Sequence, residues 1–195
     1  MIRSRTARRA TDTFALFLFV SALLLAVASP ARAQTTRPTP DRNVIGYGFD
    51  VGVLFPDEEF ESTFAFDGFG EYYLTPRISV RSMLAWAHPG VDGRTEDHFR
   101  QVKLLFGANY NWIYKRFRPF GGAGAGVYFV RLKLDGVEDP EGETRGGLFF
   151  GGGSDYILND ESAIKVEIRW DIVSDPPGLP DASAATLTFG YKRFF

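Results

Sequence analysis

Charged side chains at every second position are the feature of this sequence whose spacing most clearly suggests chemistry. In "AIKVEIRWDIV", residues 163–173, Lys165, Glu167, Arg169 and Asp171 alternate with apolar residues. Successive side chains of a β-strand point to opposite sides, so all four charges lie on one face of a strand. Opposite charges on one face could line a selective pore or could neutralise one another as a salt-bridged plug.

Nine charged residues from several such runs are predicted to face one common interior. They are Asp67, Glu71, Arg81, Lys103, Asp155, Lys165, Glu167, Arg169 and Asp171. If the runs form a barrel of eight strands, its interior has room for little more than side chains. We therefore interpret the nine residues as a structural lumen charge network, a plug rather than a channel.

Two histidines suggest a different chemistry. His88 and His98 flank a stretch that contains Asp92, Glu96 and Asp97, and imidazoles with carboxylates are common ligands of metal ions. The stretch is polar and Gly-containing, which is typical of an exposed loop. We therefore expect no metal site there, and no Ser–His arrangement indicates a nucleophile with its base.

Two further segments do not match the binding motifs that they resemble. The segment "GGAGAG", residues 121–126, does not match G-x-G-x-x-G and lacks the Lys-Ser/Thr of a phosphate-binding loop. The acidic stretch 135–143 has Pro140 where a calcium-binding EF-hand loop requires Gly. The sequence thus predicts a protein that is not an enzyme and that uses no cofactor.

The elements that carry these residues are predicted to be strands throughout. Alternation of apolar and polar residues indicates eight of them, at 44–54, 63–74, 78–87, 101–113, 119–132, 145–158, 163–173 and 187–195. Long connections rich in Gly, Pro and Asp follow the first, third, fifth and seventh strands, and short ones follow the second, fourth and sixth. This alternation is typical of an all-β, eight-stranded antiparallel up-and-down transmembrane β-barrel.

The N-terminus indicates export. Residues 1–33 combine an Arg-rich start, an apolar stretch at 14–27 and the small-x-small site Ala31-Arg32-Ala33, which together predict a signal peptide. The apolar stretch is shorter than the ~20 residues that a membrane-spanning helix needs. We expect residues 34–43 to form a flexible lead-in and residues 44–195 to form the barrel domain.

The composition of the chain restricts which classes of partner it is expected to bind. The chain after residue 33 holds 17 basic and 23 acidic residues, a formal charge of −6, and shows no basic stripe, so we expect no nucleic acid partner. The sequence contains no Cys, so its stability must come from packing and hydrogen bonding without disulfides.

The apolar strand faces are predicted to meet lipid. A soluble, lipocalin-like barrel would instead bury them, but these strands are longer than the 5 to 6 residues typical of soluble proteins. Aromatic residues also cluster near the short connections, as expected of an interfacial girdle. These are Tyr72, Tyr73, Tyr110, Trp112, Tyr114, Phe117, Phe120, Tyr156, Tyr191, Phe194 and Phe195.

The last nine residues, "LTFGYKRFF", read as a complete strand. A barrel in lipid leaves no open edge, so we expect this strand to pair with the first. Phe189, Tyr191 and the terminal Phe195 also resemble the signal that the barrel assembly machinery of the outer membrane reads on its substrates.

Three segments resemble one family. They are "RPFGGAGAGVYFVRLK" (118–133), "GGLFFGGGSDYILNDESAIKVEIRW" (146–170) and "LTFGYKRFF" (187–195). They are similar to the small eight-stranded outer-membrane β-barrels of the porin-like superfamily, which includes the OmpA transmembrane domain, OmpX and the Opa-type adhesins. The resemblance implies this fold and the outer membrane of a Gram-negative bacterium, and it implies no particular reaction.

We therefore expect a small, non-enzymatic outer-membrane protein with a filled lumen, whose extracellular loops serve surface interaction or envelope integrity. Its expected partners are outer-membrane lipid and lipopolysaccharide, the assembly machinery during biogenesis, and an extracellular ligand that the sequence does not identify. The alternatives are a narrow porin and a lipid-modifying barrel enzyme. Lipid A deacylase barrels are similar in size, but the His-x-Ser pair that they use is absent around His88 and His98.

Overall fold

The structure is a computed structural model that describes residues 40–56, 61–91, 94–134, 137–138, 142–174 and 182–195, with side chains except within 90–99 and 132–138. The predicted signal peptide, most of the lead-in and most of the acidic stretch 135–143 lie outside these ranges, as does the side chain of His98. In the ranges described, no helix has the length and apolar character needed to cross a membrane.

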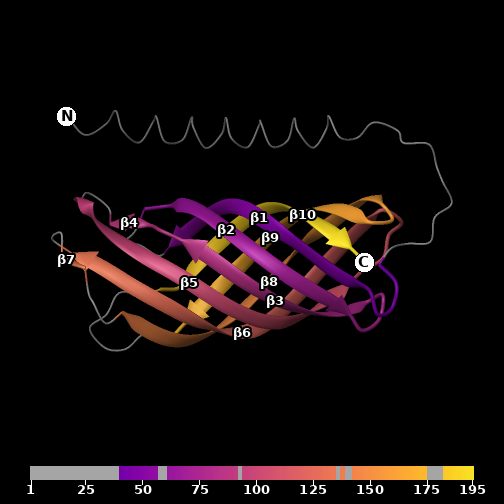
Figure 1. The fold of residues 1–195 in the computed structure, drawn as a ribbon, viewed down its shortest axis with the longest axis horizontal. Helices are drawn as coiled ribbons and strands as arrows, with labels where there is room; N and C mark the ends of the chain where they lie inside the picture. The colour runs from indigo at the N-terminus through magenta and orange to yellow at the C-terminus, as the bar shows by residue number, and fades with distance from the viewer. Residues whose placement is uncertain (1–39, 57–60, 92–93, 135–136, 139–141, 175–181) are drawn as a thin grey trace. The chain divides into compact units, whose positions relative to one another are not determined.

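Eight long strands and two short ones make up the described chain (Figure 1). The long strands are β1 (Ile45–Pro56), β2 (Thr63–Tyr73), β3 (Ile78–Ala87), β5 (Arg94–Asn111), β6 (Phe117–Leu134), β8 (Glu143–Asn159), β9 (Ser162–Val173) and β10 (Ala184–Phe194). The two-residue strands β4 (Gly90–Val91) and β7 (Val137–Glu138) extend the sheet beside β5 and β6.

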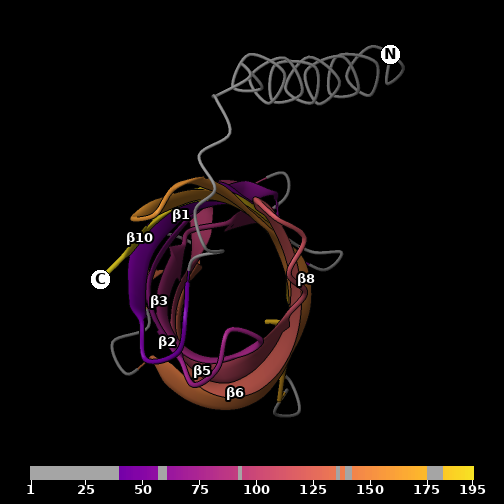
Figure 2. The ribbon, with the colours of Figure 1, turned by 90° about the vertical axis from the view of Figure 1, so that its right-hand side faces the viewer.

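Every long strand pairs antiparallel with two others, so the sheet closes on itself (Figure 2). The order around the barrel is β5-β3-β2-β1-β10-β9-β8-β6, and β6 pairs again with β5. The first and last strands meet along the register from Gly46–Phe194 to Pro56–Ala184. The predicted up-and-down barrel, including the pairing of its two terminal strands, is thus confirmed.

Three strands exceed their predicted length by three residues or more. β5 and β6 each span 18 residues and β8 spans 17, so the ladder continues into residues that we expected to be loops. The predicted ends followed the end of apolar alternation at one rim of the barrel, which we call the loop end. Backbone hydrogen bonds between neighbouring strands continue past that point, because they do not depend on apolar side chains.

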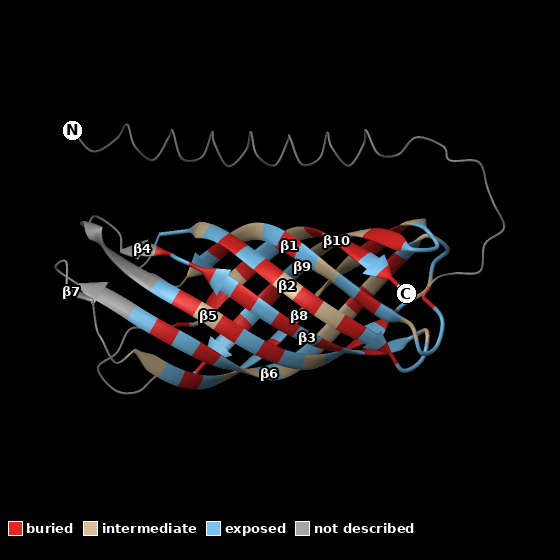
Figure 3. Ribbon diagram, viewed as in Figure 1, coloured by how far each residue is buried: buried red, intermediate tan, exposed pale blue. Residues whose placement is uncertain are grey.

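Burial alternates along much of each long strand, most regularly on β3 and β10 (Figure 3). On β3 the pattern is strictly exposed then buried, with Val80, Leu84 and Trp86 on the outside. The opposite rim, where β2–β3, β5–β6 and β8–β9 are joined by short connections, is called the turn end. The outer face carries a band of apolar and aromatic side chains, as a wall in contact with lipid requires.

One part of the predicted aromatic girdle is wrong. Tyr73, Phe120 and Phe194 are buried inside the barrel, while their neighbours Tyr72 and Phe195 face outward. Adjacent residues of a strand point to opposite faces, so two aromatic residues in a row cannot both belong to the outer girdle.

Candidate functional site

The interior of the barrel is the candidate site, because it gathers the charges. Lys165, Glu167, Arg169 and Asp171 point inward from β9 and are at most 5% exposed. The alternating neighbours Ile168 and Ile172 are 40% and 54% exposed on the outer wall. All nine residues of the predicted lumen network are buried in the structure, and each takes part in an ion pair with another interior residue.

The ion pairs form two groups. The group nearer the turn end, here called the turn-side network, consists of Asp50, Glu71, Arg81, Asp155, Lys165, Glu167 and Lys192. The group nearer the loop end, the loop-side network, consists of Asp67, Lys103, Arg169 and Asp171. Both signs are nearly balanced in each network, so the interior presents no strong fixed field of either sign.

Arg81 on β3 is the centre of the turn-side network. Its Nη1 donates to Oε2 of Glu167 at 2.7 Å, and its Nη2 lies 3.3 Å from Oε2 of Glu71. The guanidinium carbon also lies 5.3 Å from the ring centre of Phe69 and 5.0 Å from that of Phe120. A guanidinium held between carboxylates and aromatic faces in this way has little freedom to move.

Two lysines complete the turn-side network. The Lys192 ammonium lies 2.7 Å from Oε2 of Glu71 and 2.6 Å from Oδ2 of Asp155. The Lys165 ammonium lies 2.7 Å from Oε2 of Glu167 and forms a second ion pair with Asp50. Each ammonium therefore bridges two carboxylates that belong to different strands.

In the loop-side network, Arg169 and Lys103 share Asp171. Lys103 Nζ lies 2.5 Å from Oδ2 of Asp171, and Arg169 Nε lies 3.3 Å from its Oδ1. Arg169 also donates through Nη1 to Oδ2 of Asp67 at 2.9 Å. Tyr128 donates its hydroxyl to Oδ1 of Asp171 at 3.2 Å.

Apolar side chains flank the networks inside the barrel. At the turn end, Tyr73, Ile157, Ala163 and Phe194 form one buried cluster. At the loop end, Leu54, Ala65, Ala87 and Ala184 form another. A third cluster includes Met83, Leu105 and Phe149 and extends to Val173 and Ala182 near the loop end. Buried apolar side chains therefore accompany the ion pairs inside the described barrel.

Sequence reasoning left two members out of the network, Asp50 and Lys192. Asp50 lies in a strand whose alternation is imperfect, and Lys192 lies in a final strand that was interpreted through its aromatic residues. The alternation of outward and inward side chains along a strand identifies both residues. Phe49 and Val51 face outward on either side of Asp50, and Tyr191 faces outward beside Lys192. Arg118 and Arg145 were also missed, and both are buried.

Arg118 holds part of the predicted lead-in. Its Nη1 and Nη2 each lie 3.4 Å from the carbonyl oxygen of Pro40. The backbone N–H of Asn43 donates to the carbonyl of Tyr73 at 2.8 Å, and Tyr72 donates its hydroxyl to Oδ1 of Asn43. The described part of the lead-in, residues 40–43, is thus bound to the turn end of the barrel.

The assembly-signal residues lie on the outer face of β10 and at its end. The Phe195 ring stacks on Tyr47 of β1 with 5.0 Å between centres, and Tyr191 lies 6.5 Å from Phe49. Phe189 is partly exposed on the same face. The structure places these side chains along the closing seam, and their recognition during assembly stays a prediction.

The described residues offer no arrangement for catalysis by metal. Among them, no group of three or more His, Cys, Asp and Glu residues is positioned to bind a metal ion. His88 is exposed on the outside, where its ring lies 6.2 Å from that of Trp86. The interior carboxylates and cations form ion pairs with one another, and their role as a structural plug stays a prediction.

Comparisons with known proteins agree with this architecture. A family model described as "Outer membrane protein beta-barrel domain" matches residues 19–192. No curated protein matches the sequence.

Several solved structures are similar to this chain. Neisserial surface protein A (NspA) has a TM-score of 0.62 at 12% identity, over 78% of this chain and 96% of that one. OprG from Pseudomonas aeruginosa has a TM-score of 0.59 at 15% identity, over 80% and 96%. Ail, the attachment invasion locus protein of Yersinia pestis, has a TM-score of 0.54 at 16% identity, over 79% and 99%. At these identities the likeness shows the fold.

Proposed function

We propose that this chain, which belongs to the outer membrane protein beta-barrel domain family, is a non-enzymatic, non-conducting support for its extracellular loops. The chain lies in the bacterial outer membrane. The barrel gives those loops a rigid base at the cell surface. Surface interaction or envelope integrity is then the task of the loops and the outer wall.

The observation that supports this proposal is the double network of interior ion pairs. Passage of a solute through the whole lumen would require Arg81 to leave Glu71 and Glu167, and Arg169 to leave Asp67 and Asp171. Separating buried partners leaves uncompensated charges in a low-dielectric interior, which is strongly unfavourable. The cost of separating these pairs supports a closed lumen.

The role of the loops has weaker support, from fold likeness. Ail is described as an attachment invasion locus protein, and it presents a barrel of the same fold. Long connections at one rim only are consistent with a surface task for this chain as well.

Conductance in planar bilayers tests the proposal. The purified, folded protein should show no steady channel current in potassium chloride. Arg81→Ser combined with Arg169→Ser, which removes one cation from each network, should leave a hydrated, acidic interior and produce small cation-selective openings. Ser82→Ala, on the outer face of the same strand, is the matched control and should remain silent.

Folding of each variant is checked by its shift in gel migration on heating, so that an unfolded protein is not mistaken for a closed barrel. Steady current from the unmodified protein would contradict a closed lumen and would favour the narrow-porin alternative.

A further inference from the structure

Three cations lie on two neighbouring turns of the turn end and are here called the turn-end cations. Arg77 lies in the turn between β2 and β3, and Lys115 and Arg116 lie in the turn between β5 and β6. Arg77 and Lys115 are exposed, and Arg116 is partly exposed. Among the residues that the structure describes, none forms an ion pair with any of these three.

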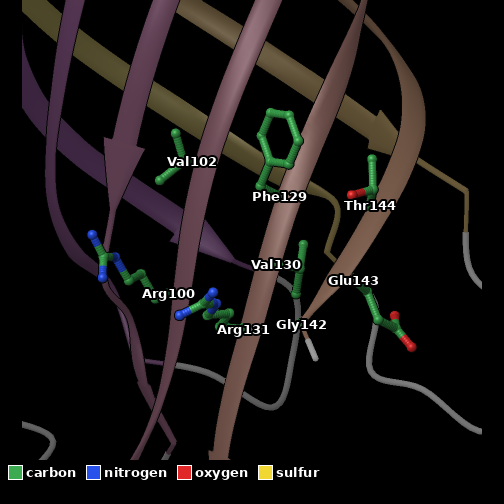
Figure 4. A pocket seen from close by; sticks show the side chains of 8 residues that line it. All are labelled: Arg100, Val102, Phe129, Val130, Arg131, Gly142, Glu143 and Thr144. Carbon is green, nitrogen blue, oxygen red and sulfur yellow. The ribbon is translucent and has the colours of Figure 1, made fainter. Parts of the chain in front are cut away.

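Two other exposed arginines already have partners. Arg193, near the end of β10 on the same rim, pairs with Glu161, with 3.3 Å between Nη2 and Oε2. At the loop end, Arg131 lines a hollow of about 340 Å³ on the outer wall (Figure 4), and it too takes part in an interaction within the protein. The turn-end cations differ from both, because their charge is left for a partner outside the chain.

The backbone holds the two turns next to each other. β3 and β5, which adjoin these turns, are paired, and the N–H of Asn111 donates to the carbonyl of Arg77 at 2.7 Å. The Thr75 hydroxyl accepts from the N–H of Arg77 at 3.2 Å and stabilises the first turn. The three cations therefore lie on one part of the rim.

Lys115 has a backbone conformation that favours other residues. Tyr114 and Phe117 exchange both of their backbone hydrogen bonds, so Lys115 is the first central residue of a two-residue hairpin turn. Its φ is 54°, in the left-handed region where Gly and Asn are preferred. Because strain of this kind is concentrated at functional positions, it is a second observation, independent of charge, that points to a ligand.

Exposed apolar side chains flank the cations. Leu74 and Ile78 lie on either side of Arg77. Tyr114 and Phe117 lie on either side of the other two cations, and Tyr114 is 62% exposed. Residues of this kind occupy the boundary between acyl chains and headgroups, where long cationic side chains reach the phosphate layer. The short turns of such barrels are periplasmic, so this boundary belongs to the inner leaflet.

We infer that the turn-end cations bind the phosphate groups of anionic phospholipids in the inner leaflet of the outer membrane. The flanking apolar side chains then contact the upper part of the acyl chains. Attraction of exposed cations to anionic headgroups is electrostatic and is therefore screened by salt. This inference concerns the rim of the barrel and does not depend on whether the lumen conducts.

Quenching of Trp112 fluorescence by brominated lipids measures which lipid adjoins these turns. Trp112 lies on the outer face, close to Lys115 in the same hairpin, and Trp86→Phe with Trp170→Phe leaves it as the single Trp of the chain. The folded chain is reconstituted into phosphatidylcholine bilayers that contain brominated phosphatidylglycerol or brominated phosphatidylcholine. At low salt we expect phosphatidylglycerol to be preferred by about fivefold or more, since that is the attraction of a single surface cation. High salt should weaken the preference.

Variants locate the site. Lys115→Asn removes a charge and suits the left-handed backbone. It should lower the preference by about twofold or more, while the midpoint of urea unfolding stays the same or rises. Arg77→Gln, Lys115→Asn and Arg116→Gln together should remove most of the preference. Arg193→Gln is the matched control, because it loses the same charge on the same rim from β10, which adjoins neither turn.

Four outcomes would overturn the inference. The first is no preference for phosphatidylglycerol at low salt, and the second is a preference that the triple variant keeps, including the case in which that variant loses co-sedimentation with purified peptidoglycan. The third is an equal loss in Arg193→Gln, which would reduce the effect to net charge. The fourth is competition by inorganic phosphate at matched ionic strength, which would indicate a site for small anions. Because Lys115→Asn relieves strain, the test does not depend on the triple variant folding.

Discussion

Arg169 on β9 and Asp67 on β2 form an ion pair across the inside of the barrel, with Nη1 2.9 Å from Oδ2. The two strands are not neighbours, since β1 and β10 lie between them. The pair therefore connects two strands that are not adjacent, in addition to the hydrogen bonds between adjacent strands. Similar bridges from Arg81 to Glu167 and from Lys192 to Glu71 act at the turn side.

Replacing Arg169 with Met tests how much the ion pair between Arg169 and Asp67 contributes to the stability of the barrel. The change leaves Asp67 without its cation in a buried site, so we expect a loss of roughly 3–5 kcal/mol in the free energy of unfolding. Urea unfolding in detergent micelles measures it. The double variant Asp67→Asn with Arg169→Met should lose less than Arg169→Met alone, because no unpaired charge remains.

Arg193→Gln provides the surface comparison for that experiment. Arg193 pairs with Glu161 in an exposed position, and exposed pairs contribute only about 0–1 kcal/mol. Equal losses at Arg169 and Arg193 would show that the interior pair is no more important than a surface one.

The orientation of β9 predicts opposite behaviour of adjacent residues. Ile168 faces outward beside Leu187 of β10, and Glu167 is buried against Arg81. Ile168→Arg places a charge against hydrocarbon and should cost roughly 2–4 kcal/mol near the membrane midplane. Spin labels provide the direct measurement: a label at 168 should meet a lipid-soluble quencher, and a label at 167 should not. Water exposure at 168 would contradict the assignment of the outer face.

The closing seam predicts a role for the terminal ring. Phe195 stacks on Tyr47, and its backbone N–H donates to the carbonyl of Ile45 at 2.8 Å. Phe195→Asp should lower the amount of folded, heat-modifiable barrel in the outer membrane. Phe195→Tyr keeps the ring and should retain the yield. If both variants assemble as well as the unmodified chain, the terminal aromatic residue is not an assembly signal.

The position of Gly124 in β6 has no space for a larger side chain. A Cβ at Gly124 would lie 2.1 Å from the carbonyl oxygen of Phe106 and 2.7 Å from the Phe149 ring, so the backbone of the neighbouring strand would have to move. Gly124→Ala should destabilise the barrel by about 1–3 kcal/mol, as overpacking does. Gly68→Ala is the control, because a Cβ there meets no atom within 4 Å. Unfolding midpoints in urea compare the two variants.

Much of this architecture was predictable from local pattern. Period-2 alternation in 163–173 identified β9, its two faces and the inward direction of Lys165, Glu167, Arg169 and Asp171. The alternation of long and short connections indicated an up-and-down barrel, and the need to avoid an open edge in lipid predicted that the last strand pairs with the first. These features follow from the geometry of a single strand and from the solvent it meets.

The ends of the strands were harder to predict from the sequence. β5 extends from the predicted start at 101 to Arg94 through a mostly polar segment, and β6 extends by two residues to Leu134. Ladder hydrogen bonds there join backbone groups, and backbone groups are the same for every residue other than proline. Composition alone therefore placed these ends too near the apolar wall.

The partners of each charge were decided by tertiary structure. The sequence placed Asp67 and Arg169 in one interior, but their contact depends on how the strands are staggered when the sheet closes. The same stagger brings Lys192 between Glu71 and Asp155, and sets Arg100 opposite Arg131 on the outer wall. Alternation is a property of each strand by itself, whereas register and closure are properties of all eight strands together, and that is why pairing could not be read from the chain.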